Sequence, residues 1–263
     1  MTDPTPLDKA HAAMEAAPED DAQRLRFYER LAEAELFLLL SKEATDDRIA
    51  PDIFETSDSR FVLVFDREER LTGFTGRAAP YVALSGRAIA AMLAGQGIGL
   101  AFNPEVAPSS ILIPPGAVDW LAHTLGQAPA EEEARPTEVL APKGLPDALL
   151  TALDAKLGLA VGLARKAYLA AVVYDDGTRG HLLGLTGTAP GAEGALARAV
   201  NEALVFSGIE AGSLDVVFLS DSDPMTARLA RVGLRFDLPE PPKATATSPK
   251  APGSDPDKPP ILR

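Results

Sequence analysis

Residues 60–104 decide the fold of the first half of the chain, with the sequence RFVLVFDREERLTGFTGRAAPYVALSGRAIAAMLAGQGIGLAFNP. Three short apolar runs bounded by turn residues are typical of buried strands, at residues 61–65, 81–84 and 98–102. Between them, Asp66 and Glu69 resemble a capping box that opens a short helix. Ser85 is placed to cap a second helix. The stretch therefore predicts closely alternating strands and helices, and it contains no catalytic motif.

The composition disfavours or excludes several classes of function. The 38 acidic residues outnumber the 25 basic residues, and the net charge of −13 disfavours nucleic acid and anionic membranes as partners. The chain has no cysteine, so disulfides, thiolate nucleophiles and cysteine zinc sites are excluded. The N-terminal segment lacks an apolar core and no window approaches 18 apolar residues, so we expect a cytoplasmic protein without a signal peptide or membrane span.

The residues around this stretch continue the mixed pattern. Thr5 before Pro6 predicts a helix over residues 5–17, and an acidic run at Asp20 predicts the start of another over residues 20–33. Further elements are predicted as strands at residues 36–40, 52–55 and 111–113, and as a helix over residues 115–126.

A segment rich in proline, alanine and glutamate divides the chain. We therefore predict an α+β protein with two mixed α/β-sheet domains and a C-terminal tail that lacks the apolar content to fold. The predicted units are a first domain at 1–126, a linker at 127–137, a second domain at 138–238 and a disordered tail at 239–263.

The second half follows the order β-α-β-β-α-β, which predicts a ferredoxin-like domain. The hairpin between its two middle strands is predicted at Asp175–Thr178, where Gly177 suits a tight turn. A last helix opens at Pro224, and residues 234–238 are predicted to form an edge strand. The six preceding elements are predicted at residues 138–140, 146–157, 166–173, 181–186, 192–206 and 214–219.

The glycine-rich segments do not match phosphate-binding motifs. Gly95, Gly97 and Gly99 precede a strand, and Leu100 stands where a dinucleotide fingerprint needs its third glycine. Residues 187–194 carry glycines between a strand and a helix, but the lysine and hydroxyl of a Walker loop are missing. Ordinary turns explain both segments.

Asp221 and Asp223 are the candidate cation ligands, because they follow a strand within Ser-Asp-Ser-Asp. Helix capping by Asp223 before Pro224 is the favoured alternative. The three histidines lack helical i, i+4 partners and lie far apart in sequence, at His11, His123 and His181. No G-x-S-x-G motif occurs. We therefore predict no catalytic, cofactor-binding or metal-binding residue, no cofactor and no enzymatic activity.

Two other residues lead to specific expectations. Asn103 precedes Pro104, which biases it away from helical backbone, so we expect its side chain to bind nearby backbone in the turn toward Pro108. Trp120 lies beside its helix's apolar stripe; core packing is favoured over a role as an exposed contact residue.

Several stretches resemble the SseB family, named for enhanced serine sensitivity. Residues 64–71, VFDREERL, followed by residues 100–104, LAFNP, resemble its N-terminal domain, although Asp66 and Arg67 replace the usual Thr-Ser. Residues 167–187, AYLAAVVYDDGTRGHLLGLTG, and 214–223, LDVVFLSDSD, resemble its C-terminal domain. The resemblance spans residues 25–238 and its motifs are structural.

This resemblance implies a cytoplasmic, non-enzymatic protein linked to serine tolerance, with no catalytic residues to carry over. We expect an interaction or regulatory module that binds an unidentified protein partner through exposed sheet faces or edges. The alternative is a small-molecule binding protein for an amino-acid-like ligand, with its site between the domains. Enzymatic activity would rest only on Asp221 and Asp223. The oligomeric state is left open.

Overall fold

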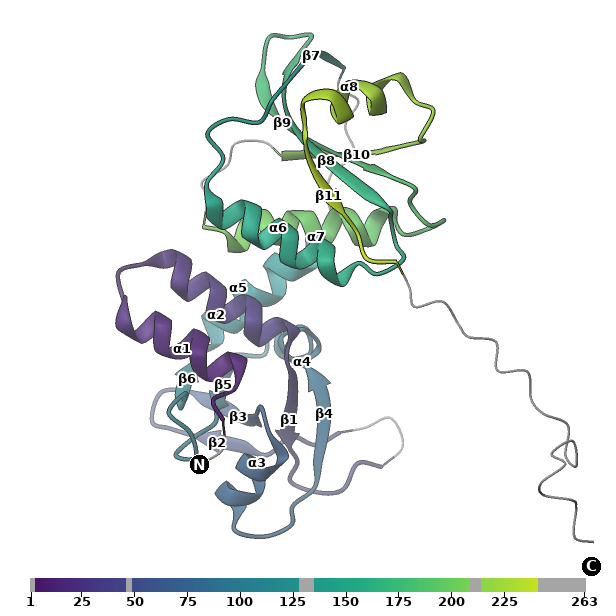
Figure 1. Cartoon of the computed structure of the whole chain (residues 1–263). Helices are drawn as coiled ribbons and strands as arrows, with labels where there is room; N and C mark the ends of the chain where they lie inside the picture. Colours follow the sequence, from purple (N-terminus) through teal and green to yellow (C-terminus); the bar gives the residue numbers. More distant parts are fainter. Residues whose placement is uncertain (1–2, 46–48, 128–134, 209–213, 241–263) are drawn as a thin grey trace, which may run out of the picture.

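The computed structural model describes residues 3–45, 49–127, 135–208 and 214–240. It confirms an α+β fold with two mixed sheets, of six and five strands, which form two bodies (Figure 1). Most of the predicted linker and nearly all of the predicted tail, residues 128–134 and 241–263, lie outside the described residues. Leu238 is buried in the second body, so ordered chain extends to the start of the predicted tail.

The first sheet has the strand order β4-β1-β3-β5-β6, and β2 also pairs with β3. Its central strands β3 and β5 run parallel, and the other pairs are antiparallel. Nearly continuous apolar sequence explains why these two strands lie at the centre, buried on both faces. The strands are β1 Glu35–Leu39, β2 Ile53–Glu55, β3 Arg60–Phe65, β4 Tyr81–Ser85, β5 Ile98–Phe102 and β6 Ile111–Ile113.

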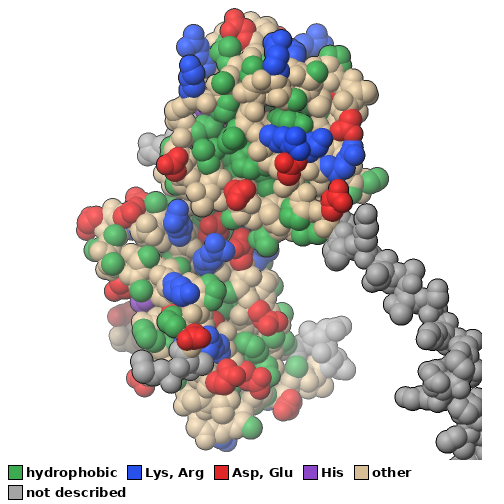
Figure 2. All heavy atoms as spheres, in the orientation of Figure 1, with side chains coloured by type: hydrophobic (Ala, Val, Ile, Leu, Met, Phe, Trp, Pro, Cys, Tyr) green, Lys and Arg blue, Asp and Glu red, His purple; other side chains and the backbone are tan. Residues whose placement is uncertain are grey.

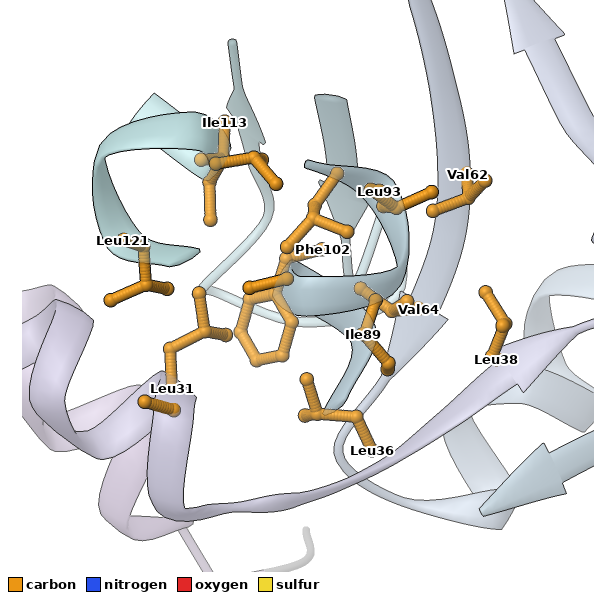
Figure 3. Close-up of a cluster of buried hydrophobic side chains, with 14 of the residues drawn as sticks. Leu31, Leu36, Leu38, Val62, Val64, Ile89, Leu93, Phe102, Ile113 and Leu121 are labelled. Atoms are coloured by element: carbon orange, nitrogen blue, oxygen red, sulfur yellow. The ribbon is translucent and has the colours of Figure 1, made fainter. Parts of the chain in front are cut away.

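Helices cover the two faces of this sheet unequally. The helices are α1 Pro6–Ala16, α2 Asp21–Glu33, α3 Glu68–Thr75, α4 Gly86–Leu93 and α5 Pro115–Gly126. On one face, α1, α2, α4 and α5 enclose the larger core, where Leu31, Val64 and Phe102 meet (Figure 3). On the other face, α3 packs through Leu71 against β1, β3 and β5.

Local helix signals in this body have mixed outcomes. Thr5 forms a capping box with Asp8, and the Ser85 hydroxyl accepts a hydrogen bond from the Ala88 amide, so both predicted helix starts are confirmed. The predicted capping box at Asp66 and Glu69 is wrong. Helix α3 follows Arg67 without a side-chain cap, because the Asp66 carboxylate binds other side chains.

Gly86 allows α4 to approach α2 closely. A Cβ atom at this position would lie 1.9 Å from the Leu31 carbonyl oxygen, which belongs to rigid helical backbone. We therefore expect Gly86→Ala to lower the free energy of unfolding by about 1 to 3 kcal/mol. Gly73 is the matched control, because a Cβ there meets nothing within 4 Å and alanine favours a helix. Urea unfolding that ranked the two variants equally would contradict this packing argument.

The second sheet has the strand order β10-β9-β8-β11, and β7 pairs with β8 beside β11. Its strands are β7 Pro136–Leu140, β8 Lys166–Tyr174, β9 Arg179–Thr186, β10 Leu214–Leu219 and β11 Leu234–Asp237. Helices α6 Asp147–Leu159 and α7 Glu193–Phe206 pack on one face, and α8 Pro224–Val232 packs on the other. The predicted edge strand is confirmed as β11, and the β8–β9 hairpin turn is confirmed with Gly177 at φ +83°.

The order of elements along the second half is confirmed, but the order across the sheet is not ferredoxin-like. That arrangement would place β7 between β9 and β10, whereas β9 and β10 are parallel neighbours and β7 pairs with β8. Pro136 lacks an amide donor, and the register of β7 shifts between Pro136 and Glu138. These features favour the outside of the sheet over a central position.

The two bodies meet where α2 and α5 face α7 (Figure 1). Phe206, the last residue of α7, belongs to the core of the first body, and its ring lies edge-on to Trp120 of α5. Trp120 is 38% exposed and also contacts Tyr28. It therefore combines partial exposure with aromatic packing. Among the described residues, no helix is long and apolar enough to cross a membrane.

Candidate functional site

The candidate site lies where the two parallel strands of the first sheet end. Asp66 directly follows β3, and Asn103 directly follows β5. Carboxyl ends of neighbouring parallel strands are common places for binding sites in α/β sheets. The N-terminus of α1 covers this position and completes a polar cluster of Thr5, Asp8, Asp66, Arg70, Asn103 and Ser109.

Asn103 connects the two strand ends. Its Nδ2 atom donates to Asp66 Oδ1 at 2.9 Å and to Ser109 Oγ at 3.1 Å, and its Oδ1 atom accepts from the Asp66 amide at 3.2 Å. The expected contact with backbone toward Pro108 is wrong, because the side chain binds the amide and carboxylate of Asp66 on the adjacent parallel strand and, next to Pro108, a side-chain hydroxyl. The expected bias away from right-handed helical backbone is confirmed, since Asn103 has a left-handed φ of +47°, which asparagine tolerates.

Arg70 lies between two carboxylates. Its Nη1 and Nη2 atoms donate to the two carboxylate oxygens of Asp8 at 2.9 and 2.5 Å, and Nη1 also donates to Asp66 Oδ1 at 2.8 Å. Only 13% of the Arg70 side chain is exposed, against 7% for Asp8 and 4% for Asp66. Such buried, two-pronged pairing fixes the position of the guanidinium.

Asp8 is held ionised in this cluster. Burial opposes its ionisation, but hydrogen bonds from Arg70, Ser109 and the Thr5 amide outweigh burial and hold the pKa of Asp8 well below its usual range. The described groups are thus paired with one another. The cluster has the character of a binding or structural site, without a free base or nucleophile.

A cavity of about 420 Å³ lies beside the cluster. Its wall includes the start of α1 at Thr5 and Leu7, the end of α2 at Glu33, and Asp66. Positive and negative side chains both line it, because Arg30 and Arg67 accompany Glu33 and Glu35. The cavity therefore suits a small ligand that carries both charges.

The comparison with known families covers this site. Residues 7–120 match a family model described as SseB protein N-terminal domain. This part of the chain belongs to that domain family. The resemblance stated for the first half is confirmed, and the matched residues include the cluster except Thr5. The chain has no match among curated proteins or solved structures.

Asn103 provides a direct stability test of the SseB N-terminal domain. Asn103→Ala removes three hydrogen bonds and forces alanine to adopt a left-handed φ. We therefore expect the free energy of unfolding to fall by about 2 to 3 kcal/mol. Asn103→Gly removes the same bonds without the backbone penalty and should lose about 1 kcal/mol less. Urea unfolding measures both losses. A midpoint near that of the wild type for Asn103→Ala would show that the bonds contribute little.

The lowered pKa of Asp8 predicts acid sensitivity. A carboxylate whose pKa is lower in the folded state stabilises above the unfolded pKa, near 4, and this contribution is lost as the pH falls. Between pH 5 and pH 2, we expect the free energy of unfolding of the wild type to fall by on the order of 2 kcal/mol more than that of Asp8→Asn. Urea unfolding across this range measures the difference, and parallel curves for the two proteins would contradict it.

A second charged group joins the SseB N-terminal domain to the second body. Lys156 of α6 is buried, and its Nζ atom lies 2.6 Å from Glu33, 3.1 Å from Glu202 and 3.4 Å from Glu29. Arg87 forms a two-pronged pair with Glu202. Figure 2 shows basic and acidic side chains side by side where the bodies meet. Burial opposes the charge of Lys156, but the glutamates outweigh burial and raise its pKa.

The residues singled out from sequence do not converge. Asp223 accepts a hydrogen bond from the Met225 amide as a helix cap, and Asp221 pairs with Arg165. No group of three potential metal ligands occurs within the described residues. His11 packs edge-on against Phe27, whereas His123 and His181 lie on α5 and β9. Sequence analysis missed Asp8, Arg70 and Lys156. Asp8 and Arg70 lie 62 residues apart, and Lys156 lies 123 and 46 residues from Glu33 and Glu202, although Arg70 also pairs with Asp66 four residues before it.

β10 leaves one side of the second sheet open. Within the described residues it pairs only with β9, and its backbone makes no other hydrogen bond. Its sequence LDVVFL contains one charge, Asp215, which accepts a hydrogen bond from the Tyr174 hydroxyl. It lacks the lysine and proline residues that commonly protect an exposed edge. This edge can therefore accept a further strand.

Proposed function

We propose that the chain is a non-enzymatic SseB-like protein that binds another protein, as an interaction or regulatory module linked through its family to serine tolerance. The observation that carries the proposal is the open, apolar edge of β10. Unpaired strand edges bind extended segments by main-chain hydrogen bonds, while alternate side chains provide specificity. The partner would therefore supply an extended apolar segment to β10.

The proposal extends to the whole chain. We assign residues 138–238 to an SseB-like C-terminal domain, on the basis of the motifs at 167–187 and 214–223. We also propose a cytoplasmic location. The absence of cysteine and the net charge of −13 support this location and a partner other than nucleic acid or anionic membrane.

Two proline variants test the edge. Backbone N–H groups of successive strand residues point alternately to the two sides, so one of Val216→Pro and Val217→Pro removes an outward donor while the other breaks a bond to β9. The variant that loses the outward-pointing N–H group should keep a urea unfolding midpoint close to that of the wild type. Affinity purification from native cytosol should recover the partner with wild type but not with this folded variant. Equal recovery by both would overturn the proposal.

The alternative function is binding of a small, amino-acid-like molecule. The sequence predicts the site of this ligand between the two domains, but the ion pairs of Lys156 lie where the domains meet. The described residues that line the cavity beside Asp66 all belong to the first body, and this cavity now carries the alternative. A thermal-shift screen of amino acids and nucleotides tests it, because a ligand that binds the native state must raise the unfolding temperature. No shift with any compound would exclude it for the compounds screened.

A further inference from the structure

The carboxylate of Asp8 occupies a socket that is built mainly from another part of the chain. Arg70 supplies two donors to it, and the Ser109 hydroxyl donates to Asp8 Oδ1 at 2.6 Å. Only the Thr5 amide, at 2.9 Å from Oδ2, comes from the same segment as Asp8. Three of these four donors would therefore remain in place without α1.

The socket is also held in shape without Asp8. Asp66 anchors Arg70 Nη1 at 2.8 Å, and Asn103 joins Asp66 to Ser109. Asn103 and Ser109 are fully buried. A planar guanidinium fixed beside a hydroxyl is an established arrangement for recognition of a carboxylate.

α1 is attached by few apolar contacts. Leu7 is its only fully buried apolar side chain, and Asp8 and His11 are the other buried residues of the helix. Ala10 and Met14 are only partly buried against the core. Since apolar burial is the main stabilising contribution to packing, the attachment of α1 depends strongly on its polar contacts, which include the Asp8 pair with Arg70 and the hydrogen bond from the Thr5 hydroxyl to Asp66. α1 can thus be displaced at a lower cost than a helix with a full apolar face.

We infer that Arg70 and Ser109 form a binding site for the carboxylate of a small α-amino acid, and that α1 fills this site with Asp8 until the ligand displaces it. The body of the ligand would enter the adjacent cavity, whose walls at the end of α2 and at Asp66 and Arg67 do not belong to α1. Its ammonium group would face the acidic side chains of Asp66, Glu33 and Glu35, which line the cavity. The inference rests on the alternative function and does not depend on the β10 edge.

Asp8→Ala tests the socket by emptying it. Added glycine should then raise the unfolding temperature of this variant, by about 2 to 4 °C at roughly five times the dissociation constant. Acetate should give a smaller shift because it lacks the ammonium group, and chloride at equal ionic strength should give none. The wild type should respond less than Asp8→Ala to the same glycine concentration, because Asp8 competes for the socket.

Three further variants keep the test falsifiable. Asp8→Asn preserves the size of the side chain and replaces Asp8→Ala if that variant does not fold. Glu15→Ala removes an exposed acid from the same helix and should respond like the wild type. Arg70→Met added to the Asp8 variant should abolish the glycine shift. If the glycine shift survives Arg70→Met, the carboxylate site is overturned while small-molecule binding elsewhere remains. If neither Asp8 variant shows a glycine shift, the carboxylate site is overturned as well.

Discussion

Replacing Lys156 by methionine should lower the free energy of unfolding by about 3 to 5 kcal/mol, the range for breaking a buried ion pair from one side. Methionine keeps the apolar stem but leaves Glu29 without its cation and Glu33 with only the half-exposed Arg30, at 3.3 Å. Glu202 retains only Arg87. The loss arises from uncompensated buried charge and not from a cavity, because the volume of the side chain is nearly preserved.

The pH dependence of this loss identifies its cause. Burial already raises the pKa of Glu29, although Lys156 opposes that effect, so removal of Lys156 should raise it further. Protonation then relieves the penalty, and the destabilisation should shrink between pH 7 and pH 5. Lys143→Met is the control, since Lys143 is exposed, and it should change stability by less than about 0.5 kcal/mol. A pH-independent loss in urea unfolding of Lys156→Met would contradict the charge argument.

Replacing Arg70 by methionine should have a similar effect, of about 3 to 5 kcal/mol. Asp8 and Asp66 would face each other without the guanidinium that separates them. Arg77→Met is the matched control, because Arg77 is exposed and near the end of α3. Urea unfolding at pH 7 measures both variants.

A second substitution should partly rescue the Arg70 variant. Asp8→Asn removes one of the two stranded charges, so adding it to Arg70→Met should recover stability, although each change destabilises the protein alone. The double-mutant cycle then gives a coupling of about 1 to 3 kcal/mol. Strict additivity of the two losses would show that Asp8 and Arg70 do not interact energetically.

The features that the sequence predicted correctly depend on neighbours along the chain. Ser85 and Asp223 cap helices whose first amides lie two or three residues away, and their partners can be found from spacing alone. The apolar runs of β3 and β5 predicted buried strands for the same reason. Local chemistry was sufficient for these elements.

The features that sequence analysis missed or predicted wrongly depend on contacts between distant residues. Asp66 satisfies the local rule for a cap, but Thr5 and Asn103 bind its carboxylate from 61 and 37 residues away. Lys156 lies on a helix of one body while two of its three partners, Glu29 and Glu33, lie on the other. The strand order of the second sheet likewise depends on whether the backbone amides of β7 can donate hydrogen bonds to neighbouring strands on both of its edges. No spacing rule supplies these contacts.

Backbone hydrogen exchange at β10 tests the proposed function most directly. In the free protein, the outward amides of residues 214–219 should exchange faster than those bonded to β9. In the complex with the partner recovered by affinity purification, these outward amides should become protected as they bond to the added strand. Protection elsewhere on the surface, with exchange in residues 214–219 unchanged, would contradict the proposal that the open edge of β10 is the contact.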